Sequence, residues 1–128
     1  MDILELLEPS TALSQAGKKK EALAELEKLW QKLLASNKTS GDSFLLVLMA
    51  SMIARKINDL DLAWKWALRG LRYSGSYSLI GESEFLCGEI AYERGDFETA
   101  KKYFQLVKEN SGMFMFKERD PKYRKLVE

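Results

Sequence analysis

Three short breaks at similar intervals constrain the fold of this chain more than any other feature of its sequence. They lie at Gly17, Asn58-Asp59 and Gly95-Asp96, and each is one or two residues long. An alanine follows the first residue of each break by five positions, and these alanines are 41 and 37 residues apart: Ala22, Ala63 and Ala100. This recurrence indicates an internal repeat whose unit is a pair of helices joined by a tight turn.

The segments between the breaks show the periodicity of amphipathic helices. After each break, apolar residues recur in steps of three and four and define one wide apolar stripe. No segment alternates apolar and polar residues over the length of a strand, and β-branched residues are sparse. Longer polar stretches at 36–42 and 74–78 separate one pair of helices from the next. We therefore predict an all-α fold of three antiparallel helical hairpins, at about 3–35, 43–73 and 79–110.

Length and composition fit one soluble domain that spans residues 1–128. The chain is 46% apolar and 30% charged, which is typical of a globular protein with a packed core. Basic and acidic residues number 20 and 19, so the near-neutral charge argues against a nucleic-acid partner. The longest apolar run, at 44–54, is much shorter than the roughly 20 residues that cross a bilayer. Because the N-terminus is acidic and Cys87 is the single cysteine, we expect a cytoplasmic protein without an intrachain disulfide.

The sequence offers little for catalysis. It contains no histidine, so neither a Ser-His-Asp nor a Cys-His arrangement is possible. Cys87 falls inside a predicted helix, where a small buried side chain is expected rather than a nucleophile. There is no glycine-rich phosphate loop, and a solvated helix face explains the acidic residues between 82 and 93 better than a metal site does. We therefore expect no enzymatic activity, no cofactor and no bound metal.

Residues 81–112 resemble a tetratricopeptide repeat. The resemblance rests on the helical spacing among seven residues: Gly88, Tyr92, Gly95, Asp96, Phe97, Ala100 and Phe104. It implies that the small residues Gly88 and Ala100 let the two helices approach closely, because side-chain bulk at a crossing sets the distance between helix axes. Asp96 would cap the second helix. Residues 44–73 and 3–34 match less closely, and the resemblance implies a right-handed solenoid of the three hairpins.

Some positions depart from the pattern of that family. The tryptophan that is usual in the first helix is replaced by Leu6, Val47 and Glu84, and no proline closes a repeat. The intervals between the alanines exceed the family's usual period of about 34 residues, and the longer connections between hairpins account for the excess. In the first hairpin, Pro9 either starts the first helix late or kinks it.

The last segment, residues 113–128, is predicted to cap the array with a short helix. Asp120 can cap such a helix and Pro121 can occupy its first turn. Three apolar residues then lie on one side of the helix: Tyr123, Leu126 and Val127. The last hairpin of a solenoid leaves an apolar face uncovered, so a terminal helix is expected to pack there. Three further residues are expected to help cover this face: Met113, Phe114 and Phe116.

The resemblance also implies where a partner binds, because the first helices of the hairpins line the concave side of such an array. The residues expected there from the second and third hairpins are Leu48, Met52, Arg55, Lys56, Phe85, Glu89, Tyr92 and Glu93. The first hairpin would add Leu7, Thr11, Ser14 and Gln15. The opposite charges in this set either pair across neighbouring hairpins or serve a partner. Two acidic residues in the third hairpin argue against the clamp of Lys, Asn and Arg with which some family members hold a peptide carboxylate.

Two tryptophans after the second break raise a related question. Trp64 lies on the apolar stripe and is expected in the core. Trp66 has basic neighbours, and it either packs in the core as well or lies on the outer edge. An exposed Trp66 would form an aromatic and basic patch with Arg72 and Tyr73, suited to a protein contact.

These observations favour a non-catalytic module that binds a peptide or a folded protein in a concave helical groove. One alternative is an immunity protein of the antitoxin type, because small solo repeat proteins of this size in bacteria can neutralise a toxin. Another is a homo-oligomeric structural protein, in which the uncovered face of the first hairpin pairs with a second copy. The expected partner is a protein or peptide, with a homodimer possible, and neither nucleic acid nor a membrane.

Overall fold

The computed structural model describes residues 2–36, 43–74 and 81–128, without the side chains of Tyr73 and Ser74. In these ranges the regular elements are all helical: α1 (Ile3–Gln15), α2 (Lys19–Ala35), α3 (Ser43–Lys56), α4 (Leu60–Ser74), α5 (Glu82–Glu93), α6 (Phe97–Ser111), the 3-10 helix η1 (Phe114–Phe116) and α7 (Pro121–Arg124). The predicted all-α fold is thus confirmed. The predicted start of the third hairpin at 79 and most of the two longer connections lie outside the described residues.

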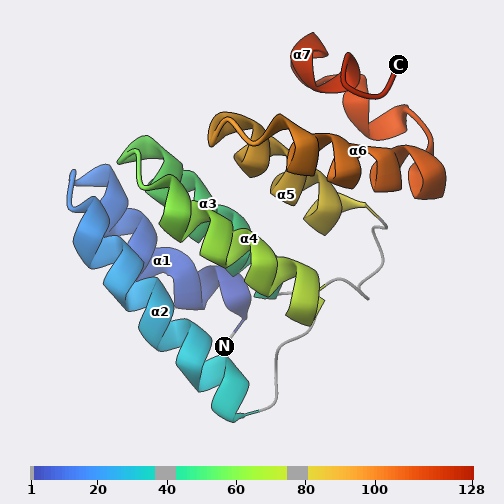
Figure 1. Ribbon diagram of the computed structural model, residues 1–128. Coiled ribbons are helices and arrows are strands. Elements are labelled where there is room, and N and C mark those ends of the chain that lie inside the picture. The colour runs from blue at the N-terminus through green and yellow to red at the C-terminus, as the bar shows by residue number, and fades with distance from the viewer. Residues whose placement is uncertain (1, 37–42, 75–80) are drawn as a thin grey trace.

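The helices pack as adjacent pairs that follow one another along the array. α1 packs against α2, α3 against α4, and α5 against α6, while contacts of α2 with α3 and of α4 with α5 join successive pairs. Figure 1 shows α1, α3 and α5 in one layer and α2, α4 and α6 in the other. The two outer surfaces are called the α1/α3/α5 face and the α2/α4/α6 face below. Within the described ranges, no helix combines the length and the apolar character needed to cross a membrane.

The three tight turns share one backbone geometry. Each contains a residue with positive φ: 82° at Gly17, 59° at Asn58 and 80° at Gly95. The amide of the next residue donates to the carbonyl five positions earlier, over 2.8 or 2.9 Å: Lys18 to Leu13, Asp59 to Ala54 and Asp96 to Ala91. A left-handed residue closes a helix in this way, and glycine or asparagine adopts that conformation with little strain. The sequence repeat is therefore also a repeat of backbone structure.

The positions aligned by the repeat lie in the core. All six residues at the two most regular positions have no exposed surface: Ala22, Ala63 and Ala100, and four residues later Leu26, Ala67 and Phe104. In the third hairpin, a Cβ atom built on Gly88 would lie only 2.5 Å from Cε1 of Phe104. Gly88 thus makes room for an aromatic ring. Asp96 caps α6 as predicted, because its Oδ1 accepts a hydrogen bond of 3.1 Å from the Thr99 amide.

The first helix runs without interruption through Pro9. It begins at Ile3, and Oδ1 of Asp2 caps it by accepting a hydrogen bond of 2.9 Å from the Glu5 amide. A late start of the helix at the proline, one of the two predicted roles, is therefore wrong. Asp2 supplies the N-cap, and Pro9 is the seventh residue of the helix, in its second turn.

Residues 113–128 cover the last hairpin, as predicted. In Figure 1 this segment lies at the end of the array, next to α6. Asp120 caps α7 by accepting a hydrogen bond of 3.0 Å from the Lys122 amide, and Pro121 occupies the first turn. Three of its side chains are buried in a cluster with residues of α5 and α6: Phe116, Tyr123 and Val127. The prediction for Phe114 is wrong, since its side chain is 75% exposed. Residues two apart in a 3-10 helix point in different directions, so Phe114 and Phe116 cannot both face the core.

Candidate partner-binding face

An exposed apolar row on α3 is the main feature of the α1/α3/α5 face. The row consists of Leu45, Leu48, Met49 and Met52, whose spacing places them on one side of the helix. Met52 is 52% exposed and Leu45 is 43% exposed, while the other two residues are half-buried. The other side of α3 packs against α4, α1 and α2. The helix is therefore apolar both on its buried side and on its exposed side. We call these four residues the α3 apolar row.

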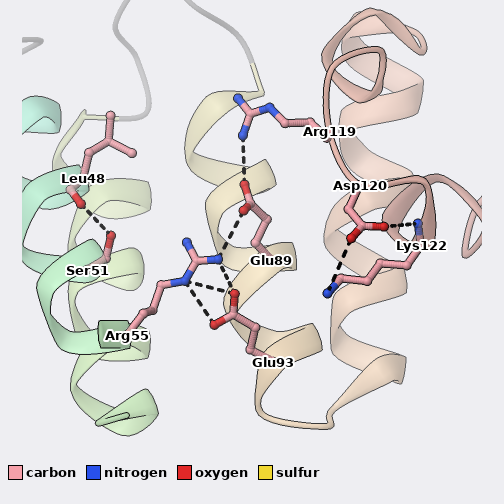
Figure 2. A network of polar contacts seen from close by, with 8 residues as sticks. All are labelled: Leu48, Ser51, Arg55, Glu89, Glu93, Arg119, Asp120 and Lys122. Carbon is pink, nitrogen blue, oxygen red and sulfur yellow. Dashed lines mark hydrogen bonds and ion pairs between the residues drawn. The ribbon is translucent and has the colours of Figure 1, made fainter. Parts of the chain in front are cut away.

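A chain of charged side chains borders the α3 apolar row. The Nε of Arg55 donates to both carboxylate oxygens of Glu93 at 3.1 Å, and its Nη2 makes a further short contact with Glu93. The same Nη2 lies 3.4 Å from an oxygen of Glu89, which in turn accepts a hydrogen bond of 3.0 Å from Nη1 of Arg119. Figure 2 shows that these side chains come from α3, from α5 and from the C-terminal segment. Arg55, Glu93, Glu89 and Arg119 together form what we call the charge chain.

Burial and neighbouring charges shift pKa values in the charge chain. The Glu89 side chain is only 14% exposed, and this burial raises its pKa although Arg55 and Arg119 act in the opposite direction. Burial lowers the pKa of Arg55, but the hydrogen bond to Glu93 and the charges of Glu93 and Glu89 outweigh burial, so the pKa is raised. Tyr123 lies close by, and burial together with the same two carboxylates raises its pKa to about 12. Arg55 therefore stays charged and paired at neutral pH.

The predicted site residues of the second and third hairpins fall into separate groups. Leu48 and Met52 belong to the α3 apolar row, and Lys56 is exposed one turn further along α3. The charged residues pair across neighbouring hairpins, which is one of the two alternatives left open by the sequence: Arg55 of the second hairpin pairs with Glu89 and Glu93 of the third. The sequence did not point to Arg119 as a member of this group. Its approach to Glu89 depends on where the C-terminal segment lies.

Phe85, another of the predicted site residues, is buried, although it is one of the residues that line the small cavity described below. Its side chain is only 1% exposed. Its ring packs edge-on against Phe104 and Phe116, with centroids 5.0 and 5.1 Å apart, and the guanidinium of Arg119 lies 4.8 Å from its centroid. The C-terminal segment thus covers Phe85 on the α1/α3/α5 face. Leu7 of the first hairpin, 3% exposed, is also a core residue.

Tyr92 lies half-buried at the edge between α5 and the C-terminal segment. Its ring packs edge-on against Phe97 and Tyr123, with centroids 4.8 and 5.3 Å away. The Nζ of Lys122 lies 5.2 Å from its ring centroid. Tyr92 therefore helps to hold the C-terminal segment in place, and only part of its side chain remains accessible.

A small cavity lies where the α3 apolar row meets the charge chain. Its volume is about 70 Å³, and its lining combines residues from α3, α5 and the C-terminal segment, among them Leu48, Glu89, Met115 and Arg119. This volume corresponds to roughly two water molecules, or to the end of one aliphatic side chain. The C-terminal segment therefore forms one wall of this face, which sequence patterns do not reveal.

The opposite, α2/α4/α6 face carries an aromatic and basic patch, but with Trp64 in place of Trp66. Trp66 is 1% exposed and meets Trp30 edge-on, with ring centroids 5.8 Å apart. Trp64 is half-buried and lines a groove of about 470 Å³ between α2 and α4. Trp64 therefore packs against both apolar clusters at the edge of the core, but it does not have the fully buried position that was expected. Ala63 and Ala67 face the core, and Trp64 is rotated by about 100° from Ala63, which places it at the boundary of the stripe.

The described residues show no arrangement suited to metal binding. Nowhere in residues 2–36, 43–74 and 81–128 do three or more His, Cys, Asp or Glu side chains gather closely enough to hold a metal ion. Cys87 is buried, and burial together with the charge of Glu84 raises the pKa of its thiol to about 12. The thiol is therefore protonated at neutral pH.

A comparison of the chain with family models, with curated proteins and with solved structures found no match.

Proposed function

We propose that the protein is a non-catalytic interaction module of the tetratricopeptide type that binds a partner protein or peptide on its α1/α3/α5 face. The exposed α3 apolar row is the observation that carries this proposal. A helix at the surface of a domain ordinarily presents polar side chains to water, and a helix that is apolar all round is ordinarily buried. Between residues 44 and 54, α3 is apolar on all sides apart from the buried Ser51, yet Leu45 and Met52 are about half exposed. A partner that covers these side chains would complete the burial of the helix.

The side chains of the α3 apolar row suit a protein partner. Covering an exposed leucine or methionine side chain contributes roughly 1.5–3 kcal/mol when burial is complete, so partial burial of two or three gives a few kcal/mol. Methionine is unbranched and flexible, and it adapts its shape to different apolar surfaces. Met49 and Met52 both belong to the row. The small cavity next to Leu48 offers room for the end of one apolar side chain of the partner, which would anchor the complex.

The charge chain has a supporting role in this proposal. Its arginines and glutamates already pair with each other, and such partly exposed pairs contribute about 0–1 kcal/mol each to stability. Because Arg55 links α3 to α5 and Arg119 links α5 to the C-terminal segment, the chain fixes the spacing of the elements that frame the apolar row. Selectivity for the partner then comes mainly from shape and apolar contact.

Site-specific photo-crosslinking tests the proposal directly. p-Benzoylphenylalanine is placed at Met52, and in a matched control at Leu106, which is 37% exposed on α6. Each variant is irradiated in a lysate of the source organism, and the adducts are identified by mass spectrometry. We expect a partner that crosslinks at position 52 and not at position 106. Its identity as a toxin would support the immunity function, and an adduct between two copies of the chain would support a homodimer. Equal amounts of adduct at positions 52 and 106, or no adduct at position 52, would contradict the proposal.

A second experiment measures the contribution of the row once a partner is identified. Met52→Lys places a charge in the centre of the row, and Leu106→Lys makes the same change outside it. We expect the first variant to weaken binding at least about tenfold, because a desolvated charge costs more than a lost apolar contact. Both variants should unfold at temperatures close to that of the unsubstituted protein, since both side chains are already exposed.

A further inference from the structure

The groove between α2 and α4 on the α2/α4/α6 face has the composition of a binding site in its own right. Its volume is about 470 Å³, and four apolar residues contribute to its lining: Trp30, Leu34, Trp64 and Leu68. Three cationic residues of α4 lie among them: Lys65, Arg69 and Arg72. We propose that this groove is a second interaction surface, and that it binds a short acidic segment of a partner protein in which carboxylates alternate with aliphatic side chains.

Arg69 gives the groove a rigid cationic floor. Its guanidinium carbon lies 4.6 Å from the ring centroid of Trp66 and 5.6 Å from that of Trp30. Its Nη1 donates to Glu27 over 2.7 Å, and the side chain is 17% exposed. A guanidinium carries five N–H donors, so a carboxylate that enters the groove can share this group with Glu27. Because Arg69 is already held in place by these contacts, binding costs little side-chain entropy.

The charge balance around the groove favours an acidic ligand. Of the lining residues that the structure describes, Asp61 is the one carboxylate, and it pairs with Arg94 over 3.1 Å. Arg94 also lies 5.4 Å from the ring centroid of Trp64, so a fourth cation borders the groove. Among the described residues of the lining itself, three cations accompany the one carboxylate, which leaves a formal charge of +2. The protein as a whole carries a net charge of only +1.

Despite burial, the pKa of Glu27 is lowered by the positive charges around the groove. Burial raises the pKa, but the hydrogen bonds from Arg69 and Gln31 and the charges of Arg69 and Lys65 outweigh burial, so the pKa is lowered. A ligand carboxylate placed beside Lys65 and Arg69 meets the same cations. It would likewise be favoured in its ionised form.

The length and the apolar lining of the groove narrow the class of ligand. The lining residues of α4 run from Asp61 to Arg72, which corresponds to about 16 Å along a helix. An extended segment of about five residues covers this length. Leu68 is 38% exposed and Leu34 and Trp64 are half-buried, so apolar side chains of the ligand find apolar partners. A nucleic-acid site would need a longer row of cations that follows a phosphate backbone, and leucine side chains contribute nothing to phosphate binding.

This surface is independent of the one proposed on the α1/α3/α5 face. The α3 apolar row belongs to the other layer of helices, and no residue of that row lines the groove between α2 and α4. A partner on one face therefore leaves the other face accessible. The two surfaces can bind two partners at the same time.

Selection from a library of displayed random nonapeptides tests the inference. The library is selected on the full chain and then sorted against the double variant Lys65→Glu/Arg72→Glu. A matched control, Lys101→Glu/Lys102→Glu, makes the same change in charge at exposed lysines of α6 that do not line the groove. Enriched peptides are synthesised with a fluorescent label, and their affinity is measured by fluorescence anisotropy at about 50 and about 300 mM salt. Circular dichroism verifies that all variants are folded.

We expect the enriched peptides to combine Asp or Glu with aliphatic residues. The groove variant should bind them at least about tenfold more weakly than the control variant, because two attractive ion pairs become repulsive. Their affinity should fall as the salt concentration rises, and Met52→Lys should leave it unchanged. The proposal is overturned if no enriched peptide depends on Lys65 and Arg72, or if the dependent peptides lack acidic residues. Displacement of these peptides by an equal concentration of oligouridine at the higher salt would also overturn it, in favour of a nucleic-acid ligand.

Discussion

The ring of Phe104 on α6 packs closely against the backbone of Gly88 on α5. A Cβ atom on residue 88 would lie 2.5 Å from Cε1 of the ring and 2.8 Å from Cδ1 and Cζ. The ring itself has no exposed surface and is enclosed by other aromatic rings, with centroids 5.0 to 5.6 Å away: Phe85, Phe116 and Tyr123. Glycine at position 88 is therefore required by packing, in a helix where alanine would be favoured by propensity.

Gly88→Ala should destabilise the protein. Overpacking costs roughly 1–3 kcal/mol, while alanine in place of glycine within a helix contributes about 0.5–1 kcal/mol of stability, so we expect a net loss of up to about 2.5 kcal/mol. Urea denaturation measures this loss. In the double variant Gly88→Ala/Phe104→Leu the new methyl group no longer meets a ring, so the combined loss should be smaller than the sum of the two single losses. Additive losses would contradict the contact between these residues.

Two phenylalanines in η1 provide a matched pair for testing the C-terminal segment. Phe116 is 2% exposed and packs between Phe85 and Phe104, whereas Phe114 is 75% exposed. Phe116→Ala should lower the unfolding free energy by about 3–5 kcal/mol, because it leaves a cavity in an aromatic cluster. Phe114→Ala should change it by less than about 0.5 kcal/mol. Similar losses in the two variants would mean that the segment does not pack on the last hairpin.

The raised pKa of Glu89 makes its contribution to stability depend on pH. The folded protein retains the proton of Glu89 at pH values where the unfolded chain, with its ordinary value of 4.5, has released it. The resulting stabilisation is complete below 4.5 and is lost as the pH rises through the folded pKa. Glu89→Gln removes this dependence, so its unfolding free energy should rise relative to that of the unsubstituted protein between about pH 4 and about pH 7. Urea titrations across this range measure the difference, and a constant or falling difference would count against the burial of Glu89.

Cys87 should resist thiol reagents as long as the protein is folded. The side chain has no exposed surface, and burial with the nearby charge of Glu84 raises its pKa to about 12. The reactive thiolate is therefore almost absent at neutral pH, and reagents cannot reach the sulfur. Labelling with iodoacetamide at about pH 7.5 should proceed at the rate of unfolding and become fast in urea. Rapid labelling of the folded protein would show that α5 is open at this position.

Local patterns in the sequence were enough to predict the hairpins. A left-handed turn favours glycine or asparagine, so the turns at Gly17, Asn58 and Gly95 could be predicted without knowledge of the fold. A close helix crossing needs a small residue, and such residues recur at fixed distances from these turns. The face that a side chain occupies was harder to predict. Trp66 is buried, which is one of the two alternatives left open for it, whereas Trp64 was expected in the core and is only half-buried. A small rotation about the helix axis decides which of two residues near the edge of a stripe is buried.

The composition of the candidate site depended on contacts between distant segments. Phe85 was predicted to be accessible, but the C-terminal segment lies over it. Arg119 reaches Glu89 across 30 positions of sequence, and helical periodicity says nothing about contacts over such separations. The pairing of Arg55 with Glu89 and Glu93 was one of two open alternatives. Only the distance between α3 and α5 could decide between them.

The charge chain has a consequence for how the protein unfolds. In a linear array each unit contacts its neighbours, and an end can fray while the rest stays intact. Here Glu89 is shared by Arg119 on one side and Arg55 on the other, so it spans two successive interfaces. When the C-terminal segment detaches, a carboxylate that is largely enclosed loses one of its two cations, and the interface between the second and third hairpins weakens as well. Detachment of the C-terminal segment is thereby coupled to weaker packing between the second and third hairpins. Amide exchange in α5 should therefore follow the same opening events as amide exchange in α7.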